Sequence, residues 1–175
     1  MGIATTFRSF IRGVGAVTGE LTQDPAVALY TDGSYVGSSF GGSFEASDLE
    51  RVEILRGPQG TLYGRNATGG AINLISRKPE IGEFTFNQSF TGGNYDRFKS
   101  NTGIKVPLGD STAARLSLLV SERDGLVENT GVGDDWGKED RTAVRFALRT
   151  EPTDTLIVDL AVEATKIKDT ARYSQ

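Results

Sequence analysis

Glu50 and Glu53 are the two carboxylates of this chain whose spacing comes closest to that of an acid–base pair. General acid–base catalysis needs such groups within hydrogen-bond reach of one reacting atom. Residues 51–56 alternate in polarity, which predicts a strand in which Glu53 points away from Val52 and Ile54, so no acid–base geometry follows. The chain also lacks His and Cys, the usual general base and thiolate nucleophile. The sequence therefore predicts that the protein is not an enzyme.

Three short motifs resemble ligand-binding loops, but each lacks a residue or a spacing that the loop requires. GVGAVTG at 13–19 has Thr18 where the dinucleotide fingerprint requires its third glycine. Lys138 is followed by Glu139 instead of the Ser or Thr of a phosphate loop. GDDWGKED at 133–140 carries several carboxylates, but it lacks the ordered ligand spacing of a calcium loop. We therefore predict no cofactor and no bound metal, and a solvated acidic tip at this last motif.

The composition narrows the class of protein further. The formal charge is −4, and no basic cluster occurs, so we predict no nucleic-acid partner. No apolar run reaches the roughly 18 residues of a transmembrane helix, whereas transmembrane β-strands alternate and would not produce such a run. The N-terminus lacks the apolar core and cleavage site of a signal peptide. If the chain comes from an outer-membrane protein, Met1 is expected to be internal to a longer sequence or a misassigned start.

Residues 48–79 form the most distinctive segment of the chain. VEILRGP at 52–58 predicts a strand that ends in a forced turn, because Pro58 fixes φ and Gly57 can adopt backbone angles that other residues avoid. The glycines that follow allow the backbone to fold tightly before strand character resumes at 71–76. This segment predicts a compact, β-rich structure.

The same segment closely resembles the plug-domain motif of TonB-dependent outer-membrane receptors. That motif is an acidic residue and Arg, an apolar strand, Arg-Gly-Pro, Tyr-Gly, a Gly pair and a final strand that ends in basic residues and Pro. The corresponding residues here are Glu50, Arg51, Val52 to Leu55, Arg56, Gly57, Pro58, Tyr63, Gly64, Gly69, Gly70 and Arg77 to Pro79. IRGVG at 11–15 and VALYTDGSYVG at 27–37 are similar to upstream plug elements of the family.

The sequence pattern changes near Pro79. Longer segments then alternate apolar and polar residues with period two, as in strands with two different faces. These segments are 83–90, 97–106, 112–120, 142–149 and 155–165. Their connections are short at 107–111 and 151–154, and long and acidic at 122–140. The pattern alone fits either an outer-membrane barrel or a soluble antiparallel sheet with one solvated face.

Charge placement and the preceding motif together favour the barrel. The face opposite the apolar one carries the charged side chains, as a polar lumen requires: Arg97, Lys99, Arg145, Arg149, Asp159 and Glu163. The expected fold class is mainly β, with a partial plug domain (small, mixed α/β) at 1–79. About five antiparallel strands of an incomplete transmembrane β-barrel are expected at 80–175. Because five strands alone would expose open edges to lipid, we expect the chain to be a fragment of a larger barrel.

The resemblance implies a function and partners. A receptor of this family lies in the outer membrane of a Gram-negative bacterium, in contact with its lipid. It takes up a scarce nutrient, commonly a ferric siderophore or similar iron complex, with energy from the TonB system. TonB pairs as an added strand with an N-terminal box, which is expected upstream of Met1. The alternatives are a soluble β-rich binding or adhesion module and a TonB-dependent signalling receptor.

The resemblance also assigns roles to single residues. In the family, arginines at the positions of Arg12 and Arg56 contact glutamates of the barrel wall and help to hold the plug. A guanidinium shielded from water needs an acidic partner, and pairing with Glu50 or Glu53 is the local alternative. The family presents the plug loop at this position (33–43 here) to the outside, where it touches the substrate. The candidate apex residues are Tyr35, Ser38, Ser39 and Phe40.

Overall fold

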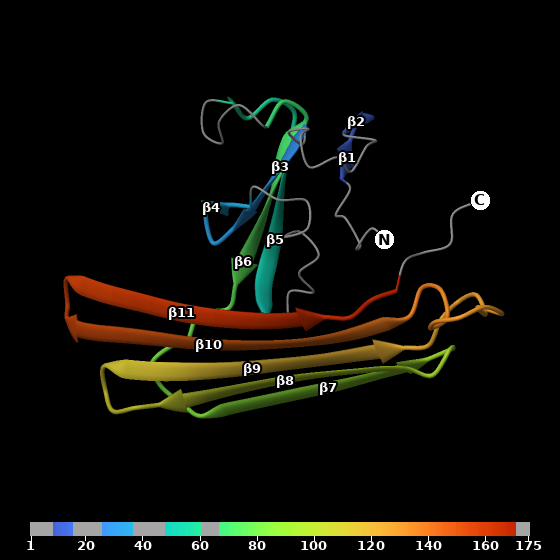
Figure 1. Cartoon of the computed structure of the whole chain (residues 1–175). Helices are drawn as coiled ribbons and strands as arrows, with labels where there is room; N and C mark the ends of the chain where they lie inside the picture. The colour runs from blue at the N-terminus through green and yellow to red at the C-terminus, as the bar shows by residue number, and fades with distance from the viewer. Residues whose placement is uncertain (1–8, 16–25, 37–47, 61–66, 171–175) are drawn as a thin grey trace. The chain divides into compact units, whose positions relative to one another are not determined.

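The computed structural model describes residues 9–15, 26–36, 48–60 and 67–170 (Figure 1). These residues divide into two units at the bond between Arg77 and Lys78. Short strands make up the N-terminal unit, and long strands make up the C-terminal unit. The division lies two residues before the predicted domain boundary at 79/80.

A mixed four-stranded sheet forms the centre of the N-terminal unit. Its strands are β3 (Val27–Thr31), β4 (Ser34–Tyr35), β5 (Leu49–Arg56) and β6 (Gly70–Ser76), in the order β4-β3-β6-β5. β3 runs parallel to β6, whereas the other neighbouring pairs are antiparallel. The short strands expected before Pro79 are thus confirmed. The described elements of this unit are strands, and Gly60, the last residue of the described segment 48–60, is helical.

Small side chains bring the backbone segments of this unit close together. The core on one face of the sheet consists of Ala28, Tyr30, Ala67 and Ala71, with Leu55 packed against it. Because a core of alanines fills little volume, its density depends on close approach of the backbones themselves. A separate hairpin of β1 (Phe10–Ile11) and β2 (Val14–Gly15) precedes the sheet in the chain.

The C-terminal unit is a five-stranded antiparallel sheet whose strands lie in sequence order (Figure 1). The strands are β7 (Thr85–Gly93), β8 (Arg97–Pro107), β9 (Thr112–Arg123), β10 (Glu139–Thr153) and β11 (Leu156–Ile167). All five predicted strands are confirmed. β9 and β10 continue beyond their predicted ends, because polar residues there still pair with the neighbouring strand.

The register separates this sheet into two chemically different faces. Even-numbered residues of the five strands share one face and odd-numbered residues share the other, except at a bulge near the end of β10, where Thr153 pairs with Leu156. One row across the even face consists of Phe86, Ile104, Leu116, Phe146 and Val162. Phe86, Phe146 and Val162 are 57%, 47% and 71% exposed, so this apolar face is not covered by the rest of the described chain.

The two ends of the sheet differ in their connections. Short turns join β8 to β9 and β10 to β11 at one end. At the other end, the segment between β9 and β10 is long and contains an antiparallel bridge between Val127 and Trp136. Among the residues that the structure describes, no helix is long and apolar enough to cross a membrane.

Candidate functional site

The Arg-Gly-Pro turn closes onto the glycine pair that follows it. β5 ends at Arg56, and Gly57 adopts a φ of 90°, which a side chain would strain. The backbone N–H of Gly57 donates to the carbonyl of Gly69 at 3.2 Å, and that of Gln59 donates to Ala67 at 2.9 Å. The turn predicted from Gly57 and Pro58 therefore brings two parts of the motif together. Tyr63 and Gly64, the middle of the motif, lie outside the described residues.

Gly69 and Gly70 form a seat for the β1–β2 hairpin. A Cβ on Gly69 would lie 2.8 Å from Cγ1 of Val14, and one on Gly70 would lie 2.7 Å from Cδ1 of Ile11. A Cβ on Gly70 would also overlap the carbonyl oxygen of Leu55. The two glycines thus accept the apolar side chains of IRGVG, which links the upstream motif to the main plug motif.

Glu50 and Glu53 form an ion-pair network instead of an acid–base site. Arg51 Nη1 lies 2.7 Å from Glu50 Oε1, and Arg51 Nε lies 2.8 Å from Glu53 Oε1. Asn73 Nδ2 donates to the other oxygen of Glu53 at 3.2 Å. The hydrogen bond from Arg51, followed by that from Asn73, lowers the pKa of Glu53, and the Glu53 carboxylate in turn raises the pKa of Arg51. A carboxylate held ionised in this way is a poor proton donor.

The two candidate locking arginines both stand at turns. Arg12 and Gly13 occupy the centre of the β1–β2 hairpin with φ values of 53° and 81°, so Arg12 lies at the hairpin tip. Arg56 is the last residue of β5 and is exposed, as is Arg12. Since Arg51 binds both Glu50 and Glu53, these carboxylates are already engaged by a neighbour other than Arg56.

The base of the candidate substrate loop is fixed by a residue that the sequence analysis did not select. Asp32 has a φ of 50° in the turn between β3 and β4, and its Oδ1 accepts a hydrogen bond from the backbone N–H of Ser76 at 2.8 Å. Tyr35, which follows this turn, is 41% exposed, and its ring lies 5.6 Å from that of Tyr30. An Asp-Gly turn is the available sequence signal for this arrangement. The other apex candidates, Ser38, Ser39 and Phe40, lie outside the described residues.

Ion pairs connect β10 and β11 along the odd face of the long sheet. Arg145 Nη1 lies 3.3 Å from Glu163 Oε2, and Arg149 holds Asp159 through two bonds of 2.7 and 2.9 Å. The predicted placement of these four residues opposite the apolar face is confirmed by the register. Further along, Arg141 Nε donates to Asp169 Oδ2 at 2.9 Å, a pair that the sequence analysis missed because Asp169 follows the end of β11.

Gly103 makes room on the same face for a buried arginine. Arg115 is 4% exposed, and a Cβ on Gly103 would lie 2.7 Å from its Nη2. Lys105 lies directly opposite Arg115 in the β8–β9 register. The odd face of β8 and β9 is therefore strongly basic, consistent with the charge that was expected there.

Three polar residues interrupt the apolar even face and satisfy one another. Gln88 Nε2 donates to Ser100 Oγ at 2.9 Å, and Thr102 Oγ1 donates to Gln88 Oε1 at 2.6 Å. Because both ends of the Gln88 amide are bonded within the sheet, its transfer to an apolar surrounding costs less than that of an unbonded amide.

The long acidic loop is held together by its own polar groups. Asp135 Oδ1 accepts from the backbone N–H of Asn129 at 2.9 Å, and Glu139 pairs with Arg123 at 2.8 Å. In the part of the chain that the structure describes, no group of three or more carboxylates is arranged to hold a metal ion.

Comparison with known proteins connects both units to one group of proteins. Residues 3–71 match the family model described as TonB-dependent Receptor Plug Domain. The pesticin receptor of Yersinia pestis is 35% identical over 136 residues, which are 75% of this chain and 20% of that receptor. The metal-pseudopaline receptor CntO of Pseudomonas aeruginosa is 30% identical over 120 residues, 67% of this chain and 16% of that receptor. The chain thus spans about one fifth of the length of the curated relatives it matches.

Solved structures share the fold. The ferric yersiniabactin uptake receptor FyuA from Yersinia pestis has a TM-score of 0.74 and 31% identity, over 81% of this chain and 23% of the receptor. The siderophore receptor PiuA from Acinetobacter baumannii also has a TM-score of 0.74, at 22% identity, over 96% of this chain and 22% of the receptor. A match over 96% of the chain includes residues of both units.

Proposed function

We propose that this chain, which belongs to the TonB-dependent outer-membrane receptors, supplies part of the plug and the first wall strands of a nutrient-uptake receptor. In this proposal residues 1–79 belong to the plug, and residues 80–175 belong to the barrel. One observation supports this proposal above all: the plug motif is followed in the chain by a sheet with one apolar and one charged face. An apolar face suits lipid, and a charged face suits a water-filled lumen.

The proposed substrate is a ferric siderophore or a similar iron complex. The 31% identity to a ferric yersiniabactin uptake receptor supports this class. A complex of another metal is the second candidate, because a metal-pseudopaline receptor is 30% identical. Energy would come from TonB, which would bind an N-terminal box as an added strand. We propose no catalytic role for the residues that the structure describes.

The test is an uptake assay on the complete receptor that contains this segment. The receptor is expressed in cells that lack other siderophore receptors, and radiolabelled metal is supplied as ferric yersiniabactin, a ferric catecholate or metal-pseudopaline. We expect accumulation of one complex that stops when TonB is deleted. A receptor that is present in the outer membrane but accumulates none of these complexes would contradict the substrate assignment. Accumulation without TonB would contradict the energy source.

Arg12 and Arg56 are proposed to hold the plug through glutamates of the barrel wall. Both residues are exposed, one at a hairpin tip and one at a strand end, which supports such a role. In the complete receptor, Arg56→Gln should make cells more sensitive to a large hydrophilic antibiotic. Arg51→Gln is the matched control, because Arg51 is engaged by Glu50 and Glu53. Equal sensitivity of both variants would remove this role from Arg56.

The loop that begins at Tyr35 is proposed to contact the substrate, with Ser38, Ser39 and Phe40 at its apex. The exposure of Tyr35 on a turn that Asp32 fixes supports this placement. Tyr35→Ala should weaken substrate binding roughly tenfold, about 1.4 kcal/mol. Phe10→Ala, which removes an exposed ring from the β1–β2 hairpin, is the control. Unchanged affinity in the Tyr35 variant would show that the apex does not include it.

A further inference from the structure

Residues 78–84 form a strap across one end of the long sheet. Lys78 Nζ lies 2.9 Å from Asp159 Oδ2 on β11, whereas Thr85 begins β7. β11 and β7 are the two outer strands of the sheet. Seven residues reach about 24 Å when extended, and four strand spacings are about 19 Å. The strap is therefore long enough to cross the short-turn ends of all five strands.

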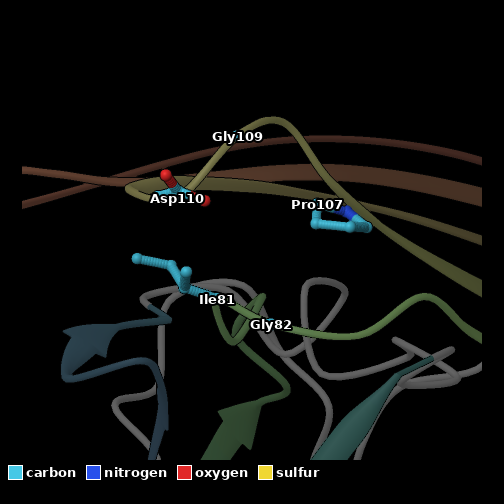
Figure 2. Close-up of a pocket in the computed structure, with 5 residues that line it drawn as sticks. All are labelled: Ile81, Gly82, Pro107, Gly109 and Asp110. Atoms are coloured by element: carbon cyan, nitrogen blue, oxygen red, sulfur yellow. The ribbon is translucent and has the colours of Figure 1, made fainter.

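The strap also lies close to the rest of the sheet beyond Lys78. Pro79 is fully buried. Further along, the strap faces the β8–β9 turn across a cavity of about 450 Å³, and Figure 2 shows Ile81 and Gly82 on one side of it. The turn residues on the other side are Pro107, Gly109 and Asp110. The ion pair with Asp159 and the burial of Pro79 thus position the first two residues of the strap.

Asp159 is oriented by Arg149 as well as bound by Lys78. Arg149 donates to both of its oxygens, Nε to Oδ1 at 2.7 Å and Nη2 to Oδ2 at 2.9 Å. Such a bidentate, charge-assisted pair fixes the plane of the carboxylate. The Asp159 side chain is 34% exposed, so its two ion pairs are partly shielded from water.

The residue before Lys78 is bonded within the other unit. The backbone N–H of Arg77 donates to the carbonyl of Asp48 at 2.9 Å. One peptide bond therefore separates a residue bonded in the plug from a residue bonded to the wall. A force applied to the plug would act directly on the Lys78–Asp159 ion pair, because no flexible linker lies between Arg77 and Lys78.

We propose that Asp159 is a positioning residue for uptake, which clamps Lys78 so that the C-terminal end of the plug stays on the barrel wall while the rest of the plug rearranges. The inference rests on the proposed function, because only a transporting receptor pulls on its plug. The clamp makes the plug a tethered element whose movement ends at Arg77. Asp159 then has a specific role, whereas a lumen-facing position requires only that its side chain be polar.

Hydrogen exchange on the purified complete receptor tests whether the clamp exists. Asp159→Asn and Lys78→Met should each speed exchange of the strap amides at least tenfold. Glu163→Gln is the matched control, because Glu163 pairs with β10 on the same face of the same strand without touching the strap. Strap exchange that is the same in all three variants overturns the clamp.

Crosslinking tests whether the clamp stays closed during uptake. Cysteines replace Lys78 and Asp159 in a receptor otherwise free of cysteine, and a short bismaleimide joins them. Uptake by the crosslinked receptor should remain within about twofold of that by the receptor with Lys78 and Asp159 in place, which a contact that opens in each cycle would not permit. Loss of uptake on crosslinking overturns the proposal. If the unmodified receptor takes up no complex, the proposed function fails, while the exchange experiment still decides whether the clamp exists.

Discussion

The plug unit and the long sheet are stabilised in different ways: the first by close packing at glycines, the second by alternation of apolar and polar residues. In the plug unit, the decisive positions are glycines, where Val14, Ile11 and the Leu55 carbonyl occupy the space that a side chain would fill. In the long sheet, the decisive feature is alternation, since even-numbered positions share a face across the five strands up to Thr150 of β10. A single added methyl group should therefore disturb the plug, whereas the sheet should tolerate change unless the polarity of a face is reversed.

Reversing the polarity of the even face should have the largest effect. Val162→Arg puts a charge beside Phe146 on the apolar face, which should cost about 2–4 kcal/mol near the middle of a bilayer. Ala161→Arg, one residue earlier, puts the same charge on the odd face and should cost much less. The measurement is the free energy of unfolding of the complete receptor in lipid. Equal losses for the two variants would contradict the assignment of the faces.

Filling the glycine seat should have the next largest effect. Gly70→Ala introduces a Cβ at a φ of 146° and against the backbone of Leu55, which should destabilise the plug by about 3 kcal/mol. Gly60→Ala is the control, because nothing lies within 4 Å of its added Cβ. Calorimetry of the complete receptor should show a lower plug transition for Gly70→Ala alone. A shift of equal size for Gly60→Ala would show that the glycine pair is not a packing seat.

The same substitution in the long sheet should be milder. Gly103→Ala meets the tip of the Arg115 side chain, which can move, and not a backbone atom. We expect a loss of about 1 kcal/mol, since a flexible neighbour relieves most of the overpacking. The comparison with Gly70→Ala uses the same calorimetric experiment. A larger loss at Gly103 than at Gly70 would reverse the contrast between the two units.

The smallest effect should come from the exposed ion pairs of β5. Because hydrogen bonds from Arg51 and then Asn73 lower the pKa of Glu53, its carboxylate stabilises the plug above its ordinary pKa. That contribution disappears as the pH falls through the lowered value. Glu53→Gln should therefore lower the melting temperature of the plug slightly at neutral pH, and this effect should shrink as the pH falls below the ordinary carboxyl pKa and through the lowered one. A difference in melting temperature that does not change with pH would contradict this account.

Local rules were enough to predict much of the fold. Period-two alternation located the five strands, since each strand has one apolar and one polar side. The positive φ of Gly57 follows from the Arg-Gly-Pro turn. The motif also identified Gly69 and Gly70, although sequence alone did not reveal that Ile11 and Val14 are their partners.

Contacts between residues far apart in sequence could not be predicted from those rules. Lys78 and Asp159 are 81 positions apart, and only the sheet order places β11 at the start of the strap. The partner of Gly103 is a side chain on the next strand, which depends on an exact register. Asp32 bonds to Ser76 because β3 and β6 run parallel, and no local pattern specifies that pairing.

Spin labelling along β11 tests the central assignment most directly. Single cysteines are introduced at each position from 156 to 167 in the complete receptor, labelled with a nitroxide and reconstituted in lipid. Labels at even positions should collide with lipid-soluble oxygen, and labels at odd positions with a water-soluble nickel complex, in strict alternation. Even positions shielded from both reagents would mean that another protein layer covers this face, and the receptor-wall assignment would be wrong.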